Sequence, residues 1–427
     1  MKTQPSSVLT AAALLTATLA LAANASAFTE VARGALTLTT TGRVAYDSNV
    51  VGNATEQEDL VFTVAPTLNY SRAAGLGTIE ASLGVSINRY ADLTAFDSED
   101  ILAAVHVGLP TPEGARQQGS FDAGYSDRSD IDETVGARIR AKTWSTSFTG
   151  SYRAGPRTDL RLGASFSDTT RDIFSDQTQW TAGVGLDYND FLGGFGLSGD
   201  YRYTDTESSS FLTVGALDQS SHHLAGGVFY KFISGLRASL DAGYRWTDRA
   251  ASETASGETS DNSFTFGLRL DGPFLPPSRF PKLKSTFSLG LEQGQTLGLN
   301  DTGSTTLVGG LSLAWQARER TALSFNASRK QGLSSTNLST VTNMLQLGVE
   351  QAVGARGSLS ASLGQEWSSF PGTGRDDRRT RGSAGFNYSF NRNWQAGTSY
   401  TATLSRSSHA LHDYDRHLVS GFLSCTF

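Results

Sequence analysis

The sequence predicts an all-β protein: a single transmembrane antiparallel up-and-down β-barrel of about 20 strands, with 18 as the alternative count. Three observations predict this fold. Apolar and polar residues alternate along most of the chain, short turns alternate with longer polar loops between these runs, and the last residue is Phe427. The composition agrees, because only 18% of the 427 residues are charged, against roughly 25% in soluble domains. Beyond residue 27, no stretch approaches the ~20 apolar residues of a membrane-spanning helix.

The N-terminal segment has the pattern of a secretory signal peptide. Lys2 precedes an apolar run over residues 8–23, and the small residues Ala25, Ser26 and Ala27 follow. This order of a basic start, an apolar run and a small-residue site is typical of a peptide that is cleaved after export. We therefore expect a signal peptide at 1–27 and one barrel domain at 28–427. An uncleaved membrane anchor is the alternative, and the short, Ala-rich run disfavours it.

Alternation with a period of two is the main evidence for strands. Successive strand side chains point to opposite faces of a sheet, so each such run has one apolar and one polar face. A helical period would scatter the same apolar residues around the helix axis. Two of the clearest runs have these apolar positions: Phe62, Val64, Pro66, Leu68 and Tyr70; and Leu236, Ala238, Leu240, Ala242, Tyr244 and Trp246.

The connectors predict the strand count and the hairpin order. Nine short connectors alternate with longer polar ones, such as residues 47–59 and 204–219, which gives ten hairpins. The third long connector has only about seven residues, so we expect no constriction loop folded into the barrel from it. A soluble β-sandwich or propeller is the alternative. It is disfavoured because aromatic residues gather at the ends of the apolar runs, as in the girdles of membrane barrels; these are Tyr46, Tyr70, Tyr152, Tyr188, Trp246, Trp315, Trp367 and Trp394.

The C-terminal strand resembles the assembly signal of outer-membrane barrels. Its alternate apolar positions include Val419 and Leu423, and the chain ends in Phe427. We expect these three residues to be recognised by the barrel-assembly machinery of the outer membrane, and membrane lipid to surround the folded barrel.

Strand parity assigns many charged residues to the face opposite the apolar one, which would line the lumen. A lipid-facing Arg or Lys at the membrane midplane costs ~2–4 kcal/mol, so an inward direction is expected. Two interpretations remain open: a pore wall that tunes permeation, or a salt-bridged network that fills the lumen. Basic and acidic residues are equally many, which predicts weak ion selectivity. The candidates are Arg43, Glu80, Asp122, Arg161, Asp187, Asp200, Arg202, Lys231, Arg237, Asp241, Arg245, Arg269, Glu292, Lys330, Glu350 and Glu366.

No catalytic, metal or cofactor site is predicted. Six histidines occur, but neither G-x-S-x-G nor H-E-x-x-H does, and both motifs carry the geometry of known active sites. The acidic residues 127–133 lack the spacing and glycine of a calcium loop, so we expect a solvated outer loop there. The net charge of −6, without a basic patch, argues against nucleic acid as a partner.

Residues 42–72 carry the clearest family resemblance. They read Y-D-S-N-V at 46–50 and, after a polar loop, D-L-V-F-T-V-A-P-T-L-N-Y at 59–70. This pattern resembles the β-barrel porins of bacterial outer membranes, a broad group that includes barrels encoded beside exopolysaccharide-synthesis genes. The resemblance implies an outer-membrane location reached through the periplasm, and no catalytic residues.

Two functions are therefore expected, in order. The first is a porin-like diffusion channel for small hydrophilic solutes. The alternative is a non-catalytic component of exopolysaccharide export or assembly, which aromatic residues in the lumen would favour. Parity places only Phe229 and Phe422 clearly inward. An enzyme barrel is a third possibility, and it would require a histidine beside a serine or aspartate at the outer rim.

Overall fold

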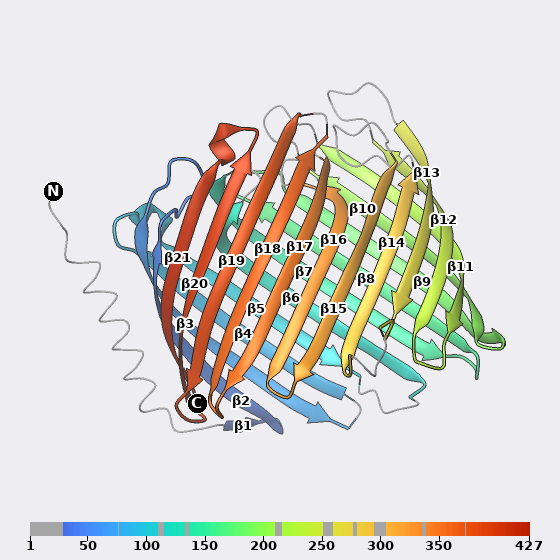
Figure 1. Cartoon of the computed structure of the whole chain (residues 1–427), viewed down its shortest axis with the longest axis horizontal. Coiled ribbons are helices and arrows are strands. Elements are labelled where there is room, and N and C mark those ends of the chain that lie inside the picture. Colours follow the sequence, from blue (N-terminus) through green and yellow to red (C-terminus); the bar gives the residue numbers. More distant parts are fainter. Residues whose placement is uncertain are drawn as a thin grey trace.

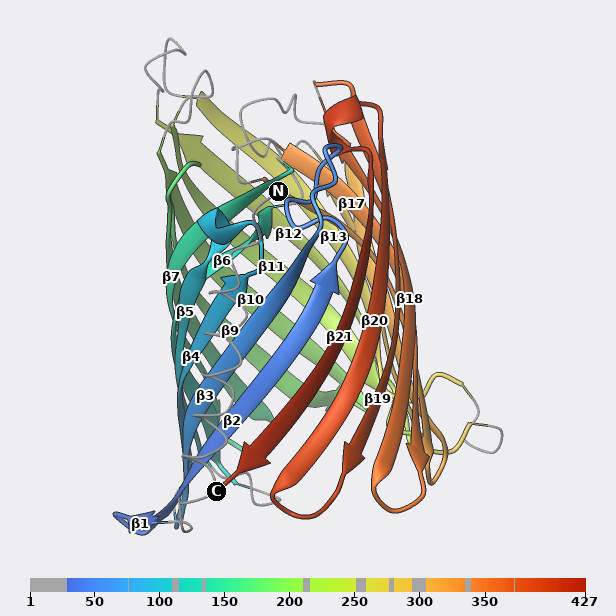
Figure 2. The ribbon, with the colours of Figure 1, turned by 90° about the vertical axis from the view of Figure 1, so that its left-hand side faces the viewer.

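The protein forms a closed barrel of 20 antiparallel strands, β2 to β21, in a computed structural model (Figures 1 and 2). The structure describes residues 29–75, 77–109, 115–132, 136–209, 216–250, 259–275, 280–293, 305–334, 339–371 and 373–427. Each strand pairs with the next along the chain, and β21 pairs with β2 to close the wall. The expected fold class and strand count are confirmed. The predicted signal peptide lies outside the described residues.

The strands are 11 to 17 residues long apart from β1, more than the ~9–11 that a tilted membrane-spanning strand needs. Two 3-10 turns, η1 (Thr94–Phe96) and η2 (Ala410–His412), lie between strands. Among the described residues, no helix is long and apolar enough to cross a membrane. The strands are β1 Thr29–Val31, β2 Gly34–Asp47, β3 Asp59–Ala74, β4 Gly77–Tyr90, β5 Ser98–Gly108, β6 Gln117–Asp132, β7 Ala137–Arg153, β8 Thr158–Arg171, β9 Gln177–Leu192, β10 Phe195–Ser208, β11 Leu217–Lys231, β12 Arg237–Arg249, β13 Thr259–Asp271, β14 Leu283–Gln293, β15 Thr306–Arg318, β16 Thr321–Leu333, β17 Ser339–Val353, β18 Gly357–Phe370, β19 Arg375–Ser389, β20 Trp394–Ser407 and β21 Tyr414–Thr426.

The two ends of the barrel differ in their connections. The strand ends that the nine short connectors join all lie at one end, which we call the turn end, and the C-terminus lies there too (Figure 2). The longer connectors lie at the other end, the loop end. β1 is a three-residue strand that pairs only with the start of β2, beyond the wall at the turn end.

One expectation about the loop end is wrong. Residues 127–132 are not a loop but the last part of β6, and they pair with β7 up to Asp132↔Ala137. The reason is that β6 and β7 continue beyond the apolar band, where both faces of a strand can be polar. Alternation therefore stops before the strand does.

The wall turns its apolar face outward and its polar face inward. On β12, Leu240 is 57% exposed on the outside, in register with Val228 of β11 and Leu268 of β13. In the described part of the chain only nine hydrophobic residues are buried, so the wall encloses no apolar core. A soluble sandwich would bury these apolar faces between its sheets, which excludes that alternative.

Candidate functional site: the inner wall of the barrel

The strand register places the backbone of all sixteen predicted pore residues at inward positions. Asp241, for example, lies between Leu240 and Ala242, which occupy the outer face of β12. The side chain of Glu292 is outside the described part of the structure. What these residues do in permeation remains a prediction.

Five strands, β8 to β12, present a network of charges on the inner wall. Asp187 is almost fully buried and lies between two arginines, with Arg161 Nη2 at 3.2 Å and Arg237 Nη2 at 3.6 Å. Arg161 Nη2 also lies 3.0 Å from Asp200 Oδ1. These side chains come from β8, β9, β10 and β12, so ion pairs link strands that are not neighbours. Such pairs hold long side chains in fixed positions along the wall.

Phe229 lies beneath this network and is 1% exposed. The guanidinium of Arg237 lies 3.9 Å from its ring centroid, and the ammonium of Lys231 lies 5.5 Å from it. Both cations contact the face of the ring, the geometry of a cation–π interaction. Phe229 and Phe422 both occupy inward positions, as expected, but Phe229 offers no open aromatic face to a solute.

Glycines on the inner face explain how these side chains lie flat, a role that alternation alone does not reveal. A Cβ at Gly196 would lie 2.1 Å from the Phe229 ring, and one at Gly185 would lie 2.5 Å from the Asp200 carboxylate. A Cβ at Gly267 would likewise lie 2.5 Å from the Asp241 carboxylate. Each glycine therefore leaves the space that an inward side chain of a neighbouring strand fills. In the sequence, glycines at inward-facing positions on strands next to charged ones would have indicated where these side chains lie against the wall.

Two rows of titratable residues cross the wall. Arg202, His223 and Arg245 are Cα partners on β10, β11 and β12. Strands are ~4.8 Å apart, so this basic row is about 10 Å long. Elsewhere, His106 Nδ1 lies 2.6 Å from Asp122 Oδ1, beside Glu80 in the same register. Some of the described inward charges thus lie beside a group of opposite charge, and others lie in a row of basic residues.

The other histidines make local contacts, and at the loop end the His412 backbone N–H donates to the His409 carbonyl at 3.0 Å. His222 is half-buried within β11, and its ring stacks on Trp246 at 5.1 Å. His417 stacks on Tyr400. His412 belongs to η2 at the loop end, where burial, and then the charge of Arg375, lower its pKa below the usual value. Within the described ranges, no group of three His, Cys, Asp or Glu residues is arranged to hold a metal ion.

Buried carboxylates brace the loop end. Asp47 accepts a hydrogen bond from Arg416 Nε at 2.9 Å, across the closing pair β2–β21. Asp127 accepts one from Arg140 Nε at 2.6 Å, between β6 and β7. Because these carboxylates are less than 10% exposed, the pairs are better shielded from solvent than ordinary surface ion pairs. They fix the rim from which the loops extend.

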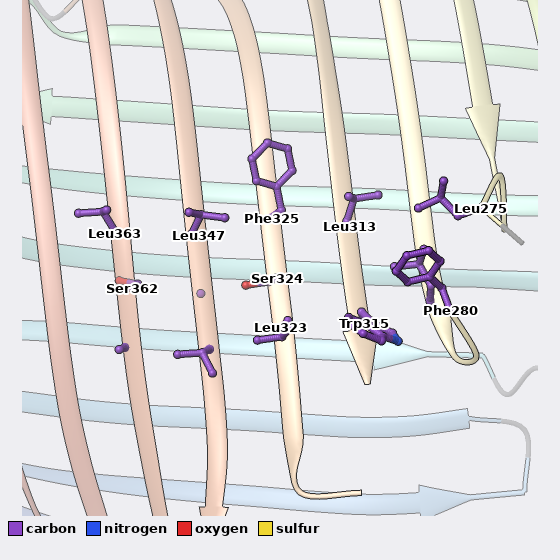
Figure 3. Close-up of a pocket in the computed structure, with 14 residues that line it drawn as sticks. Leu275, Phe280, Leu313, Trp315, Leu323, Ser324, Phe325, Leu347, Ser362 and Leu363 are labelled. Carbon is purple, nitrogen blue, oxygen red and sulfur yellow. The ribbon is translucent and has the colours of Figure 1, made fainter. Parts of the chain in front are cut away.

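The outer face of β14 to β18 carries an apolar groove of about 530 Å³ (Figure 3). Phe280 and Trp315 meet edge to face at 5.4 Å on one side of it, and Trp315 Nε1 donates to the carbonyl of Pro281 at 3.2 Å. Leu347 and Leu363 lie across the groove. Since all four side chains occupy the outward apolar face, this groove lies on the outer surface of the barrel and not on its inner wall.

Comparison with known proteins agrees with this geometry. Residues 302–424, from β15 into β21, match the family model described as "Putative beta-barrel porin 2". That match covers a run of hairpins in the C-terminal part of the wall. No curated protein matches the chain.

Solved structures show the same fold at low sequence identity. The chain superposes on the ferric-catecholate import receptor Fiu from E. coli K12 with a TM-score of 0.54 and 9% identity, covering 91% of this chain and 81% of that one. For the ferric citrate transporter FecA the values are 0.53, 10%, 92% and 78%. For BauA, the ferric preacinetobactin receptor from Acinetobacter baumannii, they are 0.52, 10%, 91% and 80%. These likenesses show the barrel fold alone.

Proposed function

We propose that the protein is a porin-like diffusion channel for small hydrophilic solutes in the bacterial outer membrane. One observation carries this proposal: charged side chains that face the inside of the barrel are open to solvent. The Asp122 side chain is 50% exposed, that of Asp200 is 47% exposed, and that of Arg269 is 59% exposed. A lumen packed with side chains, as in eight-stranded barrels, would bury such groups.

The fold and the family match support the same function. All described strands except β1 belong to the wall, and the matched family model is that of a porin. Outward apolar residues suit contact with lipid, and a polar inner face suits a water-filled passage. Mixed inner charges favour weak ion selectivity, because rings of one sign are what make a pore strongly selective.

We infer no catalytic role, and export of exopolysaccharide has no observation of its own in its favour. Aromatic faces open to the lumen would have supported it, and Phe229 is covered by Arg237 and Lys231. The lipid of the outer membrane and the barrel-assembly machinery are the partners that this proposal requires.

Conductance in a planar lipid bilayer tests the proposal. Purified protein, shown to be folded by its heat-modifiable migration, should give stable ion-conducting steps with a weak cation-to-anion preference. The same protein after heat denaturation is the control and should give none. Absence of conductance from folded protein would contradict an open channel and favour a barrel whose lumen is blocked.

A further inference from the structure

A recess in the inner wall, near the turn end, indicates what kind of solute the barrel holds. Strands β14 to β19 form it, on the opposite side of the wall from the apolar groove. Its volume is about 550 Å³, within the range of small-molecule sites. Ammonium, carboxylate, amide and hydroxyl groups all line it, including Lys282, Lys284, Ser324, Gln346, Glu350 and Ser362.

The charged groups of the recess differ from the networked charges on β8 to β12. There, Asp187 is held between Arg161 and Arg237. Lys284 and Glu350, in contrast, are exposed, and neither they nor Lys282 form an ion pair with any other described residue. Two ammonium groups against one carboxylate leave one net positive charge, which complements a monoanion.

The neutral groups of the recess are suited to binding hydroxyls. The Ser324 hydroxyl lies where Gly348 has no side chain, 2.5 Å from the position that a Cβ would take. The Ser362 and Ser383 hydroxyls lie 2.7 Å apart. The Gln346 side chain is exposed and makes no hydrogen bond to another described residue. Hydroxyls and amides both donate and accept, so they can pair with solute hydroxyls beside the lysines.

We propose that this recess binds a polyhydroxylated carboxylate of monosaccharide size, the class of the sugar acids. Lys282 and Lys284 hold the carboxylate, while Ser324, Ser362 and Gln346 pair with hydroxyls. The idea that a solute pauses in this recess on its way through the lumen rests on the proposed channel function. Binding itself is measurable at equilibrium without any current.

Titration calorimetry of the purified, folded full-length barrel tests binding, with glucuronate as the probe. Glucose carries the hydroxyls alone and acetate the charge alone, and both should bind far more weakly. Glucuronate should bind with a Kd on the order of 1 mM, because the recess is open to the lumen. Lys284→Gln or Lys282→Gln should weaken that binding about tenfold or more, the loss of roughly one charged hydrogen bond.

Lys231→Gln is the matched control. Lys231 is also an inward lysine near the turn end, but it lies outside the recess and donates to Asn189 Oδ1 at 2.6 Å. It should leave glucuronate binding unchanged. Equal binding of acetate and glucuronate, or equal effects of Lys284→Gln and Lys231→Gln, would overturn the inference.

Bilayer recordings separate this inference from the proposed function. In the intact channel, glucuronate should reduce the open current more than glucose does, and Lys284→Gln should relieve that block. Normal conductance without glucuronate-specific block or binding would overturn the recess alone. Specific binding by a barrel that never conducts would support the recess and contradict the channel.

Discussion

Glycine residues on the inner face determine where several charged side chains lie. The Asp241 carboxylate occupies the space beside Gly267, and the Asp200 carboxylate occupies the space beside Gly185. Because the glycines have no Cβ, these carboxylates lie along the wall instead of projecting into the lumen. These inward glycines thus affect both the width of the lumen and the positions of the charges along its wall.

Gly267→Ala should move the Asp241 carboxylate toward the lumen axis, because the new Cβ would stand 2.5 Å from it. The expected result is a shift of the bilayer permeability ratio toward cations. Folding stability should change by less than about 1 kcal/mol, since Ala is at least as good as Gly in a strand. Gly163→Ala is the control, because its Cβ would meet only the Phe148 carbonyl at 3.9 Å. Identical permeability ratios for the two variants would contradict this role of Gly267.

Arg202→Glu should also move selectivity toward cations, since it reverses one charge of the basic row formed with His223 and Arg245. The shift should be clear at 0.1 M salt, where the screening length is ~10 Å, and much smaller at 1 M salt, where it is ~3 Å. Arg245→Glu should act in the same direction. Arg202→Lys keeps the charge and should leave the permeability ratio near that of the parent protein. A shift equal in size at both salt concentrations would argue against an electrostatic cause.

At the scale of the strand, each element has to satisfy lipid on one face and water on the other. On β12, Leu240 faces outward and Asp241 faces inward. A one-residue change of register would exchange the two faces along the whole strand. The register is therefore fixed by the membrane as much as by hydrogen bonds between strands.

Leu240→Arg should impair folding strongly, at a cost of up to ~2–4 kcal/mol for a cation held in the membrane. Asp241→Arg, one residue further on, should fold nearly as well as the parent, because water solvates the new side chain. Refolding into lipid vesicles, followed by heat-modifiable migration, measures both. If the two variants fold equally well, the assignment of faces on β12 is wrong.

At the scale of the whole molecule, the barrel depends on its closing pair, β2 with β21. The register runs from Thr39↔Thr426 to Asp47↔Leu418. Beyond it, the backbones of Phe427 and Leu38 exchange two hydrogen bonds of 2.9 and 3.0 Å. The Asp47–Arg416 ion pair holds the same seam at the loop end. An open seam would leave unpaired backbone groups in lipid, which costs several kcal/mol for each group.

Deletion of Phe427 should lower the amount of assembled barrel, because it removes both hydrogen bonds at the turn end of the seam together with the C-terminal aromatic residue. The pore of those molecules that do assemble should keep its conductance. Outer-membrane fractions, compared by heat-modifiable migration, measure assembly. Leu411→Ala, at a loop position that is 75% exposed, is the control and should assemble normally. Normal levels of the truncated chain would rule out Phe427 as part of the assembly signal.

The sequence by itself determined the class of fold and the strand count, and it predicted inward positions for the charged residues. It could do so because alternation has a period of two. A chain with an apolar face on every strand must either bury all of those faces or place them against membrane lipid. The turns between hairpins follow from residues close in sequence, such as the short connector at residues 233–235. Local chemistry sufficed for these features.

Only the tertiary structure decided which inward residues meet. Arg161, Asp187 and Arg237 are brought together by the stagger between β8, β9 and β12, and parity carries no information about stagger. The loop-end limits of strands such as β6 were also hidden, because polar residues cover both faces there. The recess lined by Lys284 and Glu350 draws on six successive strands, and its shape depends on wall curvature, which no single strand encodes.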